Sequence, residues 1–424
     1  MIRNMCLILI FIFLQLSFSA CKIVNPPVDL LTKNVITTSS SLFYNSIVPA
    51  MSKCDSSSQR LALADSIYYI AKSKKWIPIV FSDTAVFLYK HGSTSPATIK
   101  VYGDMNGWSE TNAPQITLLN YADSKLYYGI YKAPTTTTRV DYKLVVNGSW
   151  MLDPGNPKYA WGGFGSNSEL SLSEYVYSDW VKVRSTGNKG TLSANIKIHS
   201  DTLKYDLNYR VYLPYGYSAN IKYPVIFTTD GQEYSDANLG AMNITADNMI
   251  MDGKIKPIII VFIDPRDPTN GTNRRMTELV NNPKYTHFLS TELYNQIKTN
   301  YSIVGTPDQT AILGTSLGGL NSTYTCILRP EVFGLLGIQS PAFWYYPLIM
   351  NMFANADKSL YKIYMDTGTI YDTQVKALEM KSIMEGKGYQ IMYGEYSEGH
   401  SWGSWRARID DLLFHFFGQS SVNL

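Results

Sequence analysis

The second half of the chain alternates short apolar runs with amphipathic stretches, and this alternation limits the folds that it can adopt. Continuous apolar runs beside turn-forming residues are typical of strands that are buried on both faces. The runs lie at residues 225–227, 258–263, 311–313, 335–338, 363–365 and 391–393. Between them, residues 288–300 and 373–387 repeat apolar side chains at helical spacing. Alternating strands and helices predict an α/β domain, over residues 185–424, whose parallel sheet is covered by helices.

One of these runs leads directly into a candidate nucleophile. Residues 314–319 read Gly-Thr-Ser-Leu-Gly-Gly, a G-x-S-x-G sequence that a helical stretch follows. A sharp strand-to-helix turn crowds the backbone around Ser316, so its neighbours need to lack a Cβ for the hydroxyl to stay exposed. The start of the following helix adds positive potential where an oxyanion would form. The sequence therefore predicts Ser316 as the nucleophile of an α/β-hydrolase fold.

A serine hydroxyl needs an imidazole to accept its proton during attack on an acyl carbon. In the chain order serine, acid, histidine, only His400 and His415 follow Ser316. His415 lies in an apolar helical stretch and is expected to be a packed structural residue. His400 follows the last apolar run in a polar loop, where a parallel sheet presents its functional groups. We therefore predict His400 as the base, with an ordinary surface loop histidine as the alternative.

The acid is expected in the loop after the run at residues 363–365, where Asp366 and Asp372 compete. Asp366 directly follows the strand and is expected only to brace the turn. Asp372 stands on the part of the loop that can reach His400, so we predict Asp372 as the acid. Its alternative role is the N-cap of the helix that follows, which is a common use of aspartate.

An oxyanion hole needs two backbone donors that are already in place. The amide of Leu317, directly after the nucleophile, is one candidate. The loop after the first run, Asp230-Gly231-Gln232, offers the other. Gly231 permits an unusual backbone angle, so the amide of Gln232 is the second predicted donor, and an ordinary turn is the alternative.

Residues 81–178 differ in character, with short alternating strands and turn signals. The segment around residues 140–146 alternates apolar and polar side chains and ends in Asn147-Gly148, a hairpin turn signal. The phrases at residues 101–108 and 141–154, with Trp108 and Trp150, resemble the early-set immunoglobulin-like domains that are related to glycogen-binding modules. The resemblance implies a small all-β sandwich, in which both tryptophans are either structural or sugar-stacking.

The N-terminal residues predict export. Arg3 precedes a short apolar run, and the run ends in Phe-Ser-Ala-Cys, which has the form of a secretory signal and resembles the bacterial lipobox. We expect residues 1–20 to be a lipoprotein signal peptide and Cys21 to carry the lipid, with an ordinary cleaved signal as the alternative. Residues 21–80 are then a tether with a short helix at 58–72. The expected location is a bacterial membrane, on its periplasmic side or at the cell surface.

Several motifs of the second half together resemble the putative-esterase family, which includes enterochelin, feruloyl and acetyl xylan esterases and mycolyltransferases. The motifs are the stretches at residues 210–214, 230–232, 275–279, 314–319, 339–344 and 399–402. The resemblance places Ser316, Asp372 and His400 on the family's triad and Trp344 in its acyl or aryl pocket. One departure is that Asp372 stands four residues after Gly368, where many relatives have an acid two or three residues after the matching glycine. Arg275, together with Arg274, is a candidate contact for an anionic ester, with an ion pair to Glu278 as the alternative.

Composition and the absence of certain motifs exclude other classes of function. Lys and Arg total 37 against 34 Asp and Glu, a surplus too small for a nucleic-acid-binding surface. Metal-ligand motifs, a P-loop and a dinucleotide fingerprint are absent from the sequence, so no cofactor is expected. Outside the leader, Cys54 and Cys326 are expected to be buried thiols. The predicted function is a serine carboxylic-ester hydrolase acting on a glycan-linked ester or a siderophore. An acyltransferase of the same fold and a glycan-binding lipoprotein with a vestigial esterase domain are the alternatives.

Overall fold

The computed structural model describes residues 51, 53–93, 97–120 and 124–419. These residues form two compact units, one up to Ala160 together with Gly165–Val176, and the other of Tyr177 onward together with Trp161–Phe164. The predicted signal peptide, the lipidation site at Cys21 and the start of the tether lie outside the described residues. Cys54 and Cys326 are both buried and form no disulfide, as the sequence predicts.

The first unit contains two β-sheets, as expected of an early-set sandwich. One sheet has the strand order β1-β2-β6-β5 and the other β4-β3-β7-β10-β9, with β8 also paired to β7. The strands are β1 Ile79–Phe81, β2 Thr84–Lys90, β3 Ile99–Gly103, β4 Ile116–Thr117, β5 Leu119–Asn120, β6 Leu126–Lys132, β7 Arg139–Val146, β8 Ser149–Met151, β9 Tyr159–Gly162 and β10 Gly165–Ser171. Strands β7 and β8 form the hairpin that Asn147-Gly148 predicts, with Asn147 at a φ of 50°.

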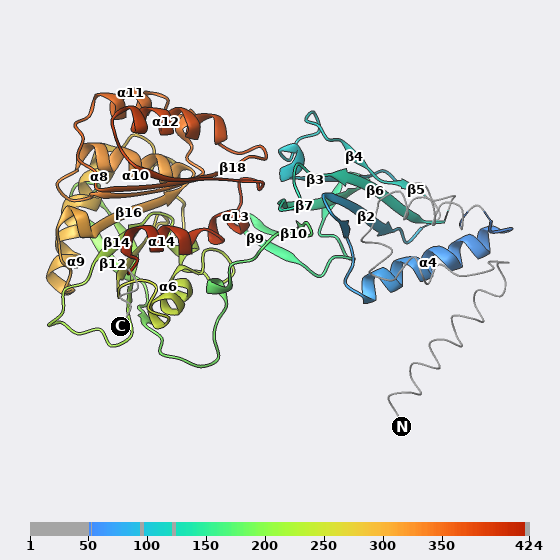
Figure 1. Ribbon diagram of the computed structural model, residues 1–424, viewed down its shortest axis with the longest axis horizontal. Helices are drawn as coiled ribbons and strands as arrows, with labels where there is room; N and C mark the ends of the chain where they lie inside the picture. Colours follow the sequence, from blue (N-terminus) through green and yellow to red (C-terminus); the bar gives the residue numbers. More distant parts are fainter. Residues whose placement is uncertain (1–50, 52, 94–96, 121–123, 420–424) are drawn as a thin grey trace. The chain divides into compact units, whose positions relative to one another are not determined.

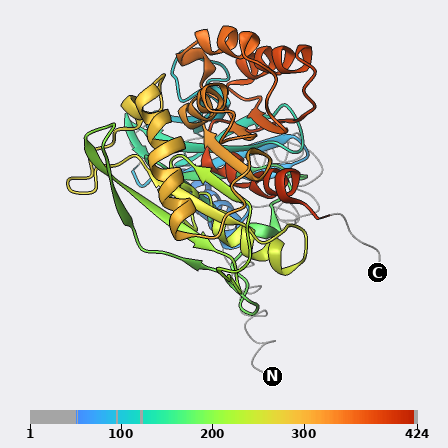
Figure 2. The ribbon, with the colours of Figure 1, turned by 90° about the vertical axis from the view of Figure 1, so that its left-hand side faces the viewer.

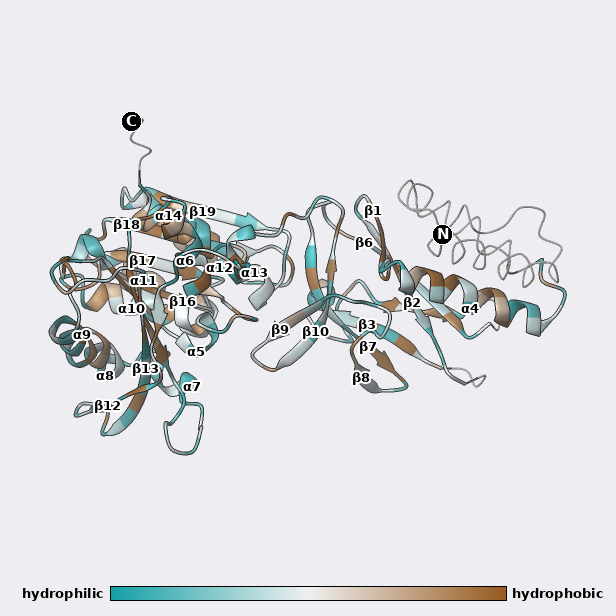
Figure 3. Cartoon of the chain, turned by 90° about the horizontal axis from the view of Figure 1, so that it is seen from below, coloured by the Kyte–Doolittle hydropathy of each residue, from teal (hydrophilic) through white to brown (hydrophobic). Residues whose placement is uncertain are grey.

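The predicted short helix is α4, Ser57–Ser73, and it begins at a capping box between Ser56 and Gln59. Its buried side chains, which include Leu63 and Ile67, pack on the apolar side chains of β1, β2 and β6. Figure 3 shows this helix carrying both hydrophobic and hydrophilic segments. The helix is therefore part of the first unit's core rather than a segment of the tether.

The second unit is built on a nine-stranded sheet with the order β11-β13-β15-β14-β16-β17-β18-β19, and β12 also pairs with β13. The strands are β11 Thr191–Leu192, β12 Ile196–Ser200, β13 Tyr205–Leu213, β14 Val225–Thr228, β15 Ile259–Asp264, β16 Thr310–Thr315, β17 Leu335–Gln339, β18 Lys362–Gly368 and β19 Ile391–Tyr396. All neighbours from β15 to β19 run parallel, whereas β13 runs antiparallel to β15. The six predicted strands are thus the parallel part of the sheet.

Helices cover both faces of this sheet, as its fully buried central strands require. Figures 1 and 2 show α8, α10, α11 and α12 on one face, and α6, α13 and α14 on the other. The helices are α5 Gly231–Tyr234, α6 Met242–Met251, α7 Arg275–Glu278, α8 Pro283–His287, α9 Tyr294–Asn300, α10 Leu317–Leu328, α11 Leu348–Asn355, α12 Gln374–Gly386, α13 Trp402–Arg406 and α14 Ile409–Phe417. The predicted helix at residues 288–300 is not a uniform α-helix, because Phe288–Leu293 form π-helical turns between α8 and α9. No helix in the described part of the chain is long and apolar enough to cross a membrane.

Candidate active site

Ser316 lies between the end of β16 and the start of α10, in a backbone conformation that side chains rarely adopt. Its φ of 58° and ψ of −117° fall outside the ordinary helical and extended regions. The amide of Ser316 donates to the carbonyl of Gln339, and its carbonyl accepts from the amide of Ala342. Hydrogen bonds to Gln339, at the end of β17, and to Ala342, just beyond it, hold this strained turn in place.

The glycines around Ser316 are required by close backbone approach. A Cβ on Gly314 would lie 2.2 Å from the carbonyl carbon of Gly318, and one on Gly318 would lie 2.4 Å from Oγ1 of Thr229. Neither residue has a positive φ. The glycine spacing therefore lets β16 and α10 meet around the serine, which is the reason that the sequence pattern predicts.

Asp372 and His400 are in direct contact. Oδ1 of Asp372 lies 2.7 Å from Nδ1 of His400. The aspartate side chain is fully buried, whereas 35% of the histidine side chain is exposed. Because Nδ1 is held by the carboxylate, the hydrogen bond assigns the ring's proton to Nδ1 and leaves Nε2 as the acceptor.

Burial alone would raise the pKa of Asp372, but hydrogen bonds reverse the shift. Hydrogen bonds from His400, Ser340 and the Gly368 amide outweigh the loss of solvation and lower the pKa of this carboxyl below its usual value. Ser340 Oγ and the Gly368 amide donate to Oδ2 at 2.6 and 2.7 Å. The amide of Thr373 donates to Oδ1 at 2.7 Å. Asp372 is thus an ionised carboxylate beneath a partly exposed imidazole.

The competing aspartate, Asp366, has a different environment. It lies within β18 and accepts a hydrogen bond from the side chain of Gln339 at 3.0 Å. Burial raises its pKa to about 7. Because His400 bonds to Asp372, the geometry favours the aspartate that the sequence favours. The N-cap of α12 is Thr373, so the alternative role of Asp372 as that cap is wrong.

The chain between Gly368 and Asp372 forms a turn, which brings the acid back to the glycine despite the four-residue separation. Tyr371 has a φ of 46°, and the chain bends so that the carboxylate returns to the amide of Gly368. A Cβ on Gly368 would lie 2.2 Å from the carbonyl oxygen of Glu398. The longer loop therefore still delivers the acid to the histidine.

The loop after β14 follows the predicted course for a different physical reason. The unusual backbone angle is at Asp230, with a φ of 52°, and not at Gly231. Gly231 is needed because a Cβ there would lie 2.2 Å from the amide nitrogen of Ile263 in β15. Within the described residues, no hydrogen bond is made by the amide of Gln232 or of Leu317. Both predicted donors are thus available to a ligand.

Arg275 supports this loop. Its Nε lies 2.9 Å from both carboxylate oxygens of Asp230, and a second nitrogen donates to the carbonyl of Thr315 at 3.2 Å. The alternative of an ion pair with Glu278 is wrong, because the guanidinium of Arg275 pairs with Asp230 and that of Arg274 pairs with Asp267. Glu278 instead accepts from the hydroxyl of Tyr205. Arg275 therefore ties the loop that carries Gln232 to the residue before the nucleophile.

The hydroxyl of Ser316 makes none of the hydrogen bonds described for this part of the chain, including any to His400. Contacts between nucleophile and base are often long before substrate binds. The three side chains follow strands β16, β18 and β19, whose carboxyl ends share one edge of the sheet. The arrangement can supply a nucleophile, a base with its carboxylate partner, and two free amide donors.

The family comparison agrees with this geometry. Residues 200–416 match the model of the family described as Putative esterase, which is about half of the chain. The chain belongs to this esterase family. It is 28% identical over 236 residues to an endo-1,4-beta-xylanase/feruloyl esterase of Xylanibacter ruminicola, covering 53% of the chain and 31% of that protein. It is also 24% identical over 229 residues to an uncharacterised Bacillus subtilis protein, covering 51% of the chain and 94% of that protein. The chain thus spans about a third of the first of these relatives.

Solved structures show the same fold. The enterobactin esterase of Shigella flexneri, crystallised in the presence of enterobactin, superposes with a TM-score of 0.65 at 18% identity. That match covers 78% of the chain and 92% of the solved structure. The ferric enterobactin esterase of Salmonella typhimurium gives a TM-score of 0.64 at 16% identity and covers 78% and 93%. Both matches cover more of the chain than the second unit alone, so the esterase fold is shared together with part of the first unit.

The predicted pocket residue of this esterase, Trp344, lies in a short 3-10 turn at Phe343–Tyr345. Its side chain is 59% exposed, and its ring centroid lies 5.4 Å from that of Tyr345 in an edge-on contact.

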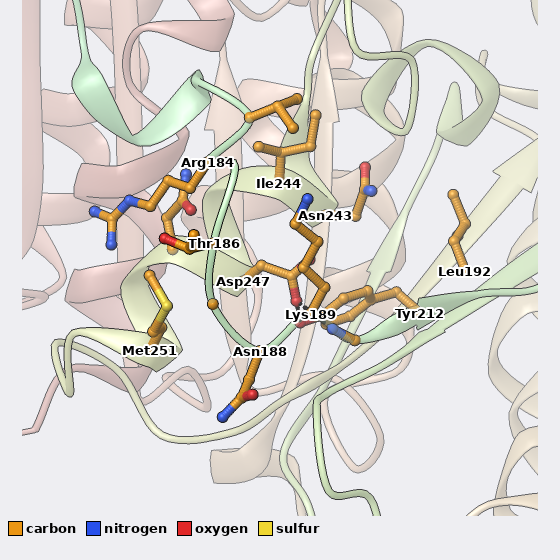
Figure 4. Close-up of a pocket in the computed structure, with 14 residues that line it drawn as sticks. Arg184, Thr186, Asn188, Lys189, Leu192, Tyr212, Asn243, Ile244, Asp247 and Met251 are labelled. Atoms are coloured by element: carbon orange, nitrogen blue, oxygen red, sulfur yellow. Dashed lines mark hydrogen bonds between the residues drawn. The ribbon is translucent and has the colours of Figure 1, made fainter.

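A separate pocket of about 200 Å³ lies between the segment at residues 183–192 and α6. Figure 4 shows Arg184, Asp247 and Tyr212 among its lining side chains. None of the predicted site residues lines this pocket. Among the described residues, no cluster of His, Cys, Asp or Glu could hold a metal ion.

Two residues near the site carry no prediction from the sequence. Ser340 contacts the carboxylate of Asp372, and Trp405 contacts both Ser340 and the ring of His400. Ser340 belongs to the stretch at residues 339–344 that contributes to the family resemblance. The sequence alone gives no sign that its hydroxyl faces the acid.

Proposed function

We propose that this chain is a serine carboxylic-ester hydrolase that acts through an acyl-enzyme. The observation that carries the proposal is the 2.7 Å contact between Asp372 and His400, together with the strained turn that presents Ser316 at the same edge of the sheet. Family membership independently supports ester hydrolysis. A buried carboxylate that orients an imidazole beside a serine is the arrangement that activates a hydroxyl.

In the first half-reaction, Ser316 Oγ attacks the acyl carbon while Nε2 of His400 takes its proton. The amides of Leu317 and Gln232 then donate to the oxygen that becomes negative. Collapse of the tetrahedral intermediate breaks the ester bond, and His400 returns the proton to the leaving alcohol. Water repeats the sequence on the acyl-enzyme and releases the acid. Asp372 remains ionised and keeps the ring oriented throughout.

The substrate class that we propose is an ester of a siderophore or of an extracellular glycan. The similar proteins support this choice of substrate class, because one is an enterobactin esterase and another is a xylanase/feruloyl esterase. The exposed rings of Trp344 and Tyr345 follow β17 at the candidate site and could contact an aromatic part of such a substrate. A panel of ferric enterobactin, methyl ferulate and acetylated xylan separates the classes by their kcat/KM values.

We further propose that the protein is exported and held at a bacterial membrane through a lipid on Cys21. The lipobox-like ending of the leader supports this location. Metabolic labelling with an alkynyl fatty acid, compared between the natural chain and Cys21→Ala, tests it. Equal labelling of the two chains would contradict lipidation at this cysteine.

Active-site labelling tests the hydrolase itself. A fluorophosphonate is expected to label the full chain at one site, with the modified peptide containing Ser316. Ser316→Ala is expected to lose the labelling and to lower kcat for p-nitrophenyl acetate by roughly 10⁶-fold. Ser322→Ala, which removes another buried serine hydroxyl from α10, is the control and is expected to keep both. Labelling that persists in Ser316→Ala would exclude this serine as the nucleophile.

A further inference from the structure

Ser340 occupies the space between the nucleophile's backbone and the acid's side chain. It follows β17 directly, in a left-handed conformation with a φ of 39°, and it is fully buried. Gln339, directly before it, accepts from the amide of Ser316, and the amide of Ala342, two residues after it, donates to the carbonyl of Ser316. Ser340 itself donates from Oγ to Oδ2 of Asp372 at 2.6 Å. One short segment thus contacts both the nucleophile and the acid.

The direction of the Ser340 hydroxyl is fixed by its two partners. The indole of Trp405 can only donate, and its Nε1 lies 2.9 Å from Ser340 Oγ. An ionised carboxylate can only accept, so the single hydroxyl proton of Ser340 points at Asp372. A hydroxyl that accepts one hydrogen bond becomes a better donor in the next. Trp405 and Ser340 therefore form a polarised chain that ends on the carboxylate.

Trp405 also contacts the histidine. Its ring centroid lies 4.9 Å from that of His400, at an interplanar angle of 88°. Trp405 is buried, with 7% of it exposed, and its ring centroid lies 5.2 Å from that of Trp402. The same indole therefore limits the tilt of the imidazole and orients the hydroxyl that holds its carboxylate partner.

We propose that Ser340, oriented by Trp405, is a positioning residue that fixes the rotation of the Asp372 carboxylate relative to His400. This inference rests on the proposed hydrolase function and adds two residues to it. Among the described residues, loss of Ser340 Oγ leaves the amide of Gly368 as the one donor to Oδ2, while His400 and the amide of Thr373 still contact Oδ1. The carboxylate is then held less firmly against rotation about its last bond, and the direction of the imidazole toward Ser316 is less tightly fixed.

The test compares Ser340→Ala, Trp405→Phe and a matched control in the full chain. The control is Ser302→Ala, which removes a buried hydroxyl whose hydrogen bond goes to the carbonyl of Ala219, away from the site. With p-nitrophenyl acetate, Ser340→Ala is expected to lower kcat and kcat/KM equally, by about tenfold, with KM unchanged. The rate of fluorophosphonate labelling is expected to fall by the same factor. Trp405→Phe, which keeps a ring beside His400 but removes the indole donor, is expected to lose about threefold.

A spectroscopic readout tests the inference without turnover. The proton between Nδ1 of His400 and Asp372 is expected to give a downfield proton NMR signal, which His400→Gln identifies by its loss. Ser340→Ala is expected to move or broaden this signal, and Ser302→Ala to leave it unchanged. Identical kinetics and identical spectra for the two alanine variants would overturn the positioning role. If the natural chain shows neither turnover nor labelling, the proposed function fails, and the NMR comparison still decides the role of Ser340.

Discussion

The pKa of a buried carboxylate is lowered in one unit of this chain and raised in the other. In the hydrolase unit, four donors surround Asp372, and its pKa is lowered. In the sandwich, Asp104 accepts from the amide of Asp141 and the indole of Trp108. Burial and the neighbouring carboxylate of Asp141 raise the pKa of Asp104 to about 7. Burial is common to both, so the number of donors and the sign of the neighbouring charge decide the outcome.

The difference separates a candidate site from a structural network. Asp372 is buried beneath a histidine that is 35% exposed, so its charge acts on a group that a ligand can reach. The sandwich network is closed: Arg139 is 1% exposed and lies between Asp141 and Glu169 at 2.7 and 2.8 Å. The first arrangement is expected to control turnover and the second to control stability.

The largest expected effect is on turnover. Asp372→Asn keeps the shape of the side chain but removes the charge and places an amide against His400, which favours the wrong tautomer. We expect kcat for p-nitrophenyl acetate to fall by roughly 10⁴-fold, with little change in the unfolding of the sandwich. Asp366→Asn is the matched control, because Asp366 is buried nearby but does not contact His400. Equal losses in the two variants would mean that the histidine has no specific carboxylate partner.

The next effect is on stability in the other unit. Arg139→Met leaves two buried carboxylates without their cation, and breaking a buried ion pair in this way typically costs about 3–5 kcal/mol. Urea unfolding, followed by hydrogen–deuterium exchange in peptides from residues 97–120 and 124–176, measures the loss. The control is Lys132→Met, whose ion pair with Asp83 is exposed and is expected to contribute little. A sandwich that is equally stable in both variants would show that the buried network contributes nothing.

The last effect is a change in pH dependence. Because the folded-state pKa of Asp104, about 7, lies above its ordinary value of 3.8, the folded state holds a proton that the unfolded state releases. This contribution to stability is complete below about pH 4 and is lost as the pH rises to about 7. Asp104→Asn is expected to flatten that part of the profile, measured as urea midpoints of the sandwich between pH 4 and 8. An unchanged slope would show that Asp104 does not titrate in this window.

Local patterns predict much of the fold and the outline of the site. The buried strands of the parallel sheet are continuous apolar runs. The spacing of Gly314, Ser316 and Gly318 predicts the turn, because the backbone crowding that requires the glycines lies within the same short segment. His400 follows from its place after the last strand. The packing of α4 on the sandwich is missed, because its apolar residues show no strong pattern against the polar composition around them.

Contacts between distant segments account for the rest. The role of Ser340 depends on β17 lying between β16 and β18, so that one end of it reaches both Ser316 and Asp372. The partner of Arg275 is Asp230, 45 residues earlier in the chain, rather than the nearby Glu278. No spacing within either segment encodes these pairings, since they arise only when the sheet is assembled.

The main-chain hydrogen bonds that hold Ser316 to the end of β17 have a consequence for how such an enzyme can diversify. They involve no side chain, so the reactive atoms are anchored independently of the residues at the tips of the neighbouring loops. Trp344 stands at such a tip and is more than half exposed. Its replacement can therefore change which ester is accepted without moving Ser316.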